Sequence, residues 1–124
     1  MLSRARLHYY KRILSSLSLN RAFNLFRLRS SYYFTFYSGH YYHSGKPWSV
    51  SIEPTTACNL RCPECPAGLR QLKRPTGKIS LNDFSLWLER LSPELQYLIL
   101  YFQGEPFLHP EIISIVKIAC DKNI

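Results

Sequence analysis

The sequence predicts an α/β fold, a series of parallel β/α units preceded by a basic and partly helical N-terminal extension. Two segments, 48–52 and 95–102, have the composition of β-strands. Each is followed by a polar or glycine-containing loop and then by a segment with helical periodicity. The resulting order, strand, loop, helix, strand, loop, helix, is typical of a parallel sheet with helical crossovers.

The first strand is predicted at 48–52, where large apolar residues alternate with serines up to Pro54, which ends the ladder. Ser80 is expected to cap the following helix, with Asp83 as its partner in a capping box. One face of that helix carries the apolar residues Leu81, Phe84, Leu88 and Leu91.

The second strand is predicted at 95–102, a nearly continuous apolar run of the kind found in parallel strands covered on both faces. Pro110 is then expected as the first residue of a second helix. Its predicted inward face consists of Ile112, Val116 and Ala119.

The β/α series stops at Ile124, where a third strand is expected. Two parallel strands can neither close a barrel nor cover their own edges. We therefore expect residues 48–124 to be the first two β/α units of a TIM-like, partial barrel. On this interpretation the chain is the N-terminal fragment of a longer protein and is inactive by itself.

Charge separates this predicted domain from residues 1–47. The net charge is +8, and residues 1–48 contain eight Lys and Arg residues but no Asp or Glu, whereas residues 49–124 contain eight of each sign. Residues 1–47 thus form a basic, aromatic-rich N-terminal extension. The apolar spacing predicts a helix over 7–17 and a second near 22–26, while the mixed composition of 30–45 predicts a loop or an irregular helix end.

The favoured interpretation of this extension is a helical segment packed on the outside of the next domain, with its charges solvated. A basic amphipathic segment can instead lie on an anionic membrane or bind nucleic acid. Nucleic acid is not expected as a partner, because the sequence does not show stacking aromatics placed with cations on one face.

The sequence predicts a cytoplasmic location. The start of the chain lacks the apolar core of a signal peptide, and no apolar run approaches the ~18 residues of a transmembrane helix. Three of the four cysteines lie within eight residues, a spacing that favours a shared inorganic centre over disulfides. The fourth, Cys120, is expected to be a small buried residue of a helix.

The clustered cysteines form the run Cys58-Asn-Leu-Arg-Cys62-Pro-Glu-Cys65, in the loop after the first strand. Three thiolates can bind three irons of a cubane cluster, which leaves the fourth iron open for another ligand. A zinc site is the alternative, but zinc needs a fourth ligand. The candidates for it are His43, His109 and Cys120, and none has a matching spacing. His109, next to Pro110, is expected to have a structural or loop-lining role.

This run resembles the signature of the radical S-adenosylmethionine (SAM) superfamily. The resemblance implies that Cys58, Cys62 and Cys65 hold a four-iron, four-sulfur (4Fe-4S) cluster whose open iron binds SAM. It further implies an enzyme that takes an electron from a low-potential donor and cleaves SAM reductively. The resulting 5′-deoxyadenosyl radical would abstract hydrogen from an unidentified substrate, for which peptides and proteins are candidates.

A second motif, Gln103-Gly104-Glu105-Pro106, resembles the "GGEP" loop of this superfamily, with Gln103 in place of the first glycine. The resemblance implies that Gly104, Glu105 and Pro106 belong to the SAM site and that Glu105 braces the loop. A bulky residue at position 104 is expected to stop SAM cleavage and to leave the cluster intact, because the thiolates lie on another loop.

The stretch from Ile52 to Pro63 resembles the branch whose members often carry a C-terminal SPASM domain. Another departure from the superfamily is Glu64, where many members have an aromatic residue.

The alternative function is an iron–sulfur or zinc-binding module without SAM chemistry.

Overall fold

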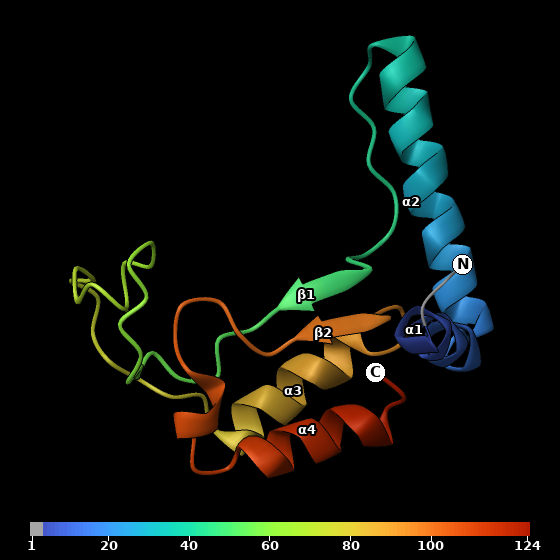
Figure 1. Ribbon diagram of the computed structural model, residues 1–124. Helices are drawn as coiled ribbons and strands as arrows, with labels where there is room; N and C mark the ends of the chain where they lie inside the picture. Colours follow the sequence, from blue (N-terminus) through green and yellow to red (C-terminus); the bar gives the residue numbers. More distant parts are fainter. Residues whose placement is uncertain (1–3) are drawn as a thin grey trace.

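The computed structural model describes residues 4–124 and contains four α-helices, one short 3₁₀ helix and two β-strands within that range (Figure 1). In chain order the elements are α1 (Arg4–Ser15), α2 (Leu19–Ser38), β1 (Ser49–Ser51), α3 (Leu81–Leu91), β2 (Tyr97–Ile99), η1 (Pro106–Leu108) and α4 (Ile112–Asp121). The predicted β/α series is therefore present, and the described residues do not form a barrel. No helix within residues 4–124 is both long enough and apolar enough to cross a membrane.

The two strands pair in parallel, with Val50 opposite Leu98. Beyond the paired residues, the amide of Ile52 donates to the carbonyl of Ile99 over 2.8 Å. Strand β2 is shorter than the predicted range 95–102 because its partner β1 contributes only three residues before Pro54, which has no N–H for the ladder.

Helices α3 and α4 pack on the same side of the sheet (Figure 1). The core between them includes Phe84, Leu88, Leu95 and Ile115, which are fully buried. As predicted, Ser80 caps α3: its Oγ accepts from the Asp83 amide over 3.0 Å and donates to the Asp83 carboxylate over 2.7 Å. The prediction of a second strand covered on both faces is wrong for the described residues, because both helices lie on one side and Tyr97 is exposed.

Helix α4 begins at Ile112, after the short helix η1, rather than at Pro110. Its inward residues are Ile112, Ile115 and Ala119, which recur at spacings of three and four and so form one stripe. Val116 and Cys120 are both exposed. Each follows a buried residue and points about 100° further around the helix, so the prediction that they face inward is wrong.

The basic extension is anchored to the core by the buried guanidinium of Arg21. It donates to the carbonyls of Ser16, Lys122 and Asn123 over 2.6–3.0 Å. Burial of this group lowers the pKa of Arg21 from its ordinary value. The cation lies at the carbonyl-rich C-terminal end of α4, where positive charge is favoured.

Helix α2 continues to Ser38, so the prediction of a loop or irregular end from residue 30 is wrong for its first part. The helix begins at the cap residue Ser18, whose side chain accepts from the Arg21 amide, and ends at Gly39 in the left-handed conformation, with φ of +70°. The Thr35 hydroxyl donates a hydrogen bond to the Tyr42 carbonyl and accepts one from the Tyr42 amide, in the segment that follows the helix. The composition of residues 30–38 did not indicate a helix, and these hydrogen bonds tie that part of α2 to the following segment.

His109 has the structural role expected of it. Its side chain is buried, with Nδ1 accepting from the Glu111 amide over 3.1 Å and Nε2 lying 2.9 Å from the carbonyl oxygen of Ile79. Because Nδ1 is the acceptor, Nε2 carries the hydrogen and donates to Ile79. The ring thus ties the start of α4 to the segment that enters α3.

We expect His109→Ala to lower the free energy of unfolding by about 2–4 kcal/mol, since it empties a buried site and leaves two backbone groups unpaired. Urea titration of the variant measures this change. His43→Ala, at an exposed position, is the matched control and should change the free energy by less than about 0.5 kcal/mol. Equal unfolding midpoints for the two variants would contradict the structural role.

Candidate metal centre

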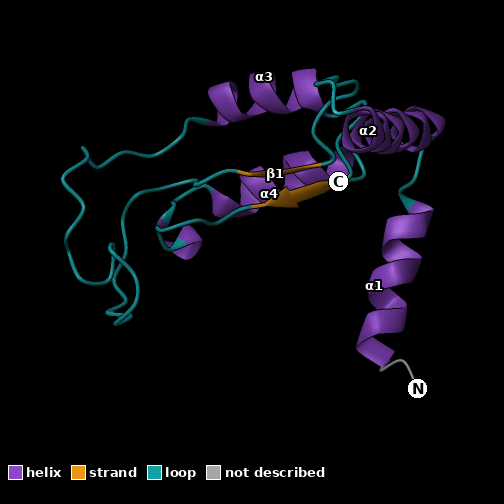
Figure 2. Ribbon diagram, turned by 90° about the horizontal axis from the view of Figure 1, so that it is seen from above, coloured by secondary structure: helices purple, strands orange, loops and turns teal. Residues whose placement is uncertain are grey.

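The two predicted motifs leave neighbouring parallel strands at the same end of the sheet. The cysteines lie in the loop 57–76, which follows β1 and projects beyond the ends of the strands (Figures 1 and 2). The loop with Gly104 follows β2. Carboxyl ends of parallel strands are where loops of different β/α units meet to form sites in α/β proteins.

The cysteine loop is closed at its base by hydrogen bonds between residues 54–56 and 77–79. The Thr56 hydroxyl accepts from the Gly77 amide over 2.8 Å, and the Thr56 amide donates to the Gly77 carbonyl over 3.0 Å. The amide of Ile79 donates to the carbonyl of Pro54 over 2.9 Å. The Glu53–Arg74 ion pair links the same two arms. The loop therefore begins and ends at fixed points, although most of its residues have no regular secondary structure.

Gly104 packs directly on the segment that leads into the cysteine loop. A Cβ built on Gly104 would lie 1.8 Å from the carbonyl oxygen of Thr55 and 3.3 Å from that of Ala57. The amide of Glu105 donates to the same Ala57 carbonyl over 2.8 Å. Ala57 immediately precedes Cys58, so the two motifs are joined through the backbone.

This contact changes what is expected of Gly104. Its φ lies outside the left-handed region, and glycine is required there because the Thr55 carbonyl occupies the space of a side chain. The two loops are not independent. We therefore withdraw the expectation that a bulky residue at 104 leaves the cysteine loop intact.

Glu105 and Pro106 shape the remainder of the second loop. The Glu105 carboxylate accepts from the Phe107 amide over 3.2 Å and so caps the short helix η1. Pro106 occupies the first turn of that helix, where its missing N–H costs nothing. The side chain of Glu105 thus braces its own loop, in agreement with the expectation from sequence.

Within the cysteine loop, Cys58 and Cys65 are half-buried, Cys62 is exposed, and all three are free thiols. The Cys65 amide donates to the Cys62 carbonyl over 3.2 Å, which makes a tight turn. Gly68 is buried against this turn, and a Cβ there would lie 2.6 Å from the amide nitrogen of Cys62. The sequence analysis did not identify Gly68 as part of the cysteine loop's packing. Its only signal in the sequence is its position, three residues after Cys65.

The three cysteine side chains are not gathered into a binding group in this structure. Within residues 4–124, no three His, Cys, Asp or Glu side chains are arranged so that they could hold a metal ion. The chemistry of the donor set nevertheless fits an iron–sulfur cluster, because three free thiols lie on one short, anchored loop. Metals commonly organise their own ligands as they bind, so cluster binding by Cys58, Cys62 and Cys65 stays a prediction.

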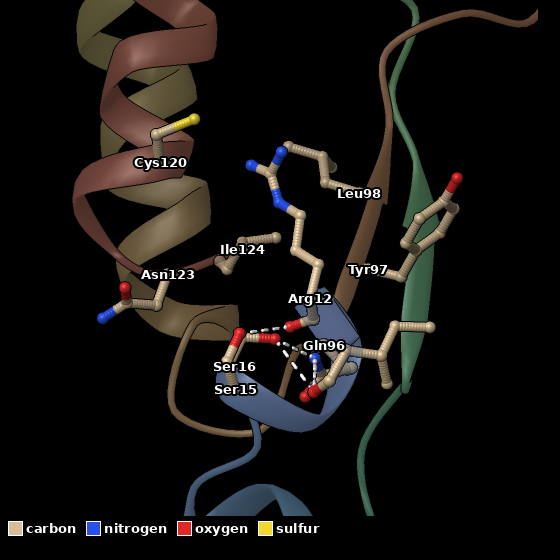
Figure 3. A pocket seen from close by; sticks show the side chains of 10 residues that line it. Arg12, Ser15, Ser16, Gln96, Tyr97, Leu98, Cys120, Asn123 and Ile124 are labelled. Atoms are coloured by element: carbon tan, nitrogen blue, oxygen red, sulfur yellow. Dashed lines mark hydrogen bonds between the residues drawn. The ribbon is translucent and has the colours of Figure 1, made fainter. Parts of the chain in front are cut away.

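A cavity of about 430 Å³ lies elsewhere, between the end of α1, the start of β2 and the end of α4 (Figure 3). The Arg12 side chain extends into it between Cys120 and Leu98 (Figure 3). The Gln96 amide nitrogen donates to the Ile13 carbonyl, and its buried Oε1 has no hydrogen-bond partner among the described residues. This cavity adjoins the amino end of β2, so it is separate from the candidate metal centre.

Comparison of the chain with protein-family models, curated proteins and solved structures finds no match in any of the three. The function is therefore inferred from the residues of this chain.

Proposed function

We propose that the chain carries the cluster loop and part of the SAM site of a radical SAM enzyme. The observation that carries the proposal is the contact of Gly104 with Thr55 and Ala57. It joins a C-x3-C-x2-C loop to a Gly-Glu-Pro loop at the carboxyl ends of two paired parallel strands. Either motif alone can arise for other reasons, whereas their direct backbone contact is expected if both serve one site.

In this proposal, the thiolates of Cys58, Cys62 and Cys65 would hold a 4Fe-4S cluster and would leave one iron without a protein ligand, available to SAM. When bound and reduced, the cluster would supply the electron for the reductive cleavage of SAM. Residues of this chain hold the two loops in place. Thr56 and Gly77 fix the base of the cysteine loop, and Gly104 fixes the second loop against it.

The parallel pair β1–β2 supports a finer proposal for the fold, namely the first two β/α units of a TIM-like partial barrel. Helices α3 and α4 lie on one side of the pair (Figure 1), as the outer helices of such a barrel do. The opposite side, with exposed Tyr101, would then face the barrel interior. Further strands would provide the cover that the described residues lack.

Anaerobic reconstitution with iron and sulfide, followed by dithionite and SAM, tests the proposed function. We expect about four irons per chain of the cluster-loaded protein, together with release of 5′-deoxyadenosine. A full iron complement without any SAM cleavage would favour an iron–sulfur module without SAM chemistry. Zinc binding with no incorporation of iron would favour a zinc module.

A further inference from the structure

Helix α2 buries its polar face. Arg21, Asn24 and Ser31 are its buried residues, and the segment 40–46 runs back along this face. Asn24 pairs with both backbone groups of Lys46, accepting from its amide over 2.8 Å and donating to its carbonyl over 3.0 Å. Thr35 does the same with Tyr42, over 3.0 and 2.8 Å. The hairpin 19–46 therefore satisfies these polar groups internally.

The opposite face of α2 is apolar and exposed. A stripe with spacings of four, three, seven and four consists of Leu19, Phe23, Phe26, Tyr33 and Tyr37. Leu19 is 90% exposed, Phe26 66% and Tyr37 79%. In Figure 1, the return segment covers one side of α2, and α2 stands away from the sheet and its helices. A helix of a globular protein normally turns such a stripe toward its core, so this stripe is oriented for an external partner.

Toward the tip of the hairpin, aromatic residues extend beyond the stripe. Tyr32, Phe34, Phe36, Tyr41 and Tyr42 are all exposed. Tyr32 is stacked on Phe36, and Phe34 is edge-on to Tyr42. The segment 30–45 contains no Lys, Arg, Asp or Glu. The tip therefore presents aromatic rings on several sides, more than one partner helix could cover.

Cations lie next to the aromatic tip in the sequence. Arg27, Arg29 and Lys46 are exposed and flank the uncharged segment. Lys46 forms an ion pair with Glu94, with 3.2 Å between Nζ and Oε1, so Arg27 and Arg29 are the cations that face a partner. Residues 1–48 contain no acidic side chain. An anionic partner would complement Arg27 and Arg29, whereas the cations of a second copy of the same hairpin would repel them.

We propose that the hairpin 19–46 docks on an anionic lipid bilayer. The Tyr and Phe rings of the stripe and of the tip enter the boundary between headgroups and acyl chains, where such residues are enriched. Arg27 and Arg29 contact lipid phosphates. Internal pairing of the polar groups of Asn24 and Thr35 lowers the cost of moving the hairpin out of water. The inference is independent of the proposed function.

Sedimentation of the protein with vesicles tests this inference. We expect binding to vesicles of phosphatidylcholine with one-third phosphatidylglycerol. Binding should be at least about tenfold weaker to pure phosphatidylcholine, which has no net charge to attract the cations. It should be weakened as much in 0.5 M salt, because salt screens the attraction between the cations and the anionic headgroups.

The combined variant Phe26→Ala, Tyr33→Ala and Tyr37→Ala should weaken vesicle binding by about tenfold or more, with helix content retained because alanine favours helix. The matched control, Trp87→Ala with Ile113→Ala, removes exposed apolar residues of α3 and α4 and should bind like the wild type. Equal binding by the two combined variants would overturn the proposal. The proposal would also be overturned if the wild-type protein does not bind vesicles but forms a dimer or binds single-stranded RNA, and the hairpin variant loses that property.

Discussion

Replacing Cys58, Cys62 or Cys65 by alanine is expected to abolish cluster incorporation, whereas Cys120→Ala should leave it unchanged. With three thiolates for a cubane cluster, each removal strips a second iron of its protein ligand in addition to the iron that is already open. Cys120 lies in α4 beside the cavity at the other end of the sheet and cannot substitute. Iron and sulfide content after anaerobic reconstitution, with the visible absorption of the cluster, measures the effect.

Cys62→Ala is the most informative of these variants. Because Cys62 is exposed, its side chain contributes little to folding, so loss of iron would report on ligation rather than on unfolding. Circular dichroism of the apoprotein should therefore match that of the wild type. A Cys62→Ala protein that retains the full iron content and absorption would remove this cysteine from the cluster and contradict the three-thiolate assignment.

The sequence predicted well those elements whose signals are local. Ser80 and Asp83 lie at the start of a helix with a clear apolar face, and the structure has that helix with that cap. The parallel pairing of the two strands followed from their order and from the helix between them. In each case the residues that carry the signal also form the contact.

Features that depend on partners distant in sequence were not predictable in this way. The last part of α2, residues 30–38, consists of Tyr, Phe, Ser and Thr residues with weak helix propensity. The hydrogen bonds of Thr35 and Ser31 to the return segment 40–46 appear only in three dimensions. Val116 matched a helical spacing from Ile112, but packing against α3 selected Ile115 instead. Periodicity allows several faces, and the packed neighbour decides between them.

The candidate metal centre shows the same division. The spacing of Cys58, Cys62 and Cys65 is a local signal that indicates their common chemistry. The reasons for the nearby glycines are contacts, since Gly68 makes room for Cys62 and Gly104 makes room for Thr55. From sequence, the resemblance assigned Gly104 to the SAM site. In the structure, a neighbouring carbonyl occupies the place of its side chain.

Gly104→Ala is therefore expected to damage the whole site. Its Cβ would lie 1.8 Å from the Thr55 carbonyl oxygen, a separation that no rotamer change can relieve, so one of the two loops must move. We expect a loss of unfolding free energy on the order of 3 kcal/mol, with iron incorporation and 5′-deoxyadenosine release both reduced to background. Urea titration, iron analysis and the SAM cleavage assay measure the three effects.

Gly77→Ala provides the matched control for this prediction. Gly77 anchors the cysteine loop through its backbone, which alanine retains. An added Cβ there meets no described atom within 4 Å, and its φ is not left-handed. The control should keep stability, iron content and SAM cleavage, which separates a clash at 104 from a general cost of replacing glycine. If Gly104→Ala instead folds stably and fills with iron but fails to cleave SAM, the glycine serves the ligand alone. The contact with Thr55 would then not be the reason for it.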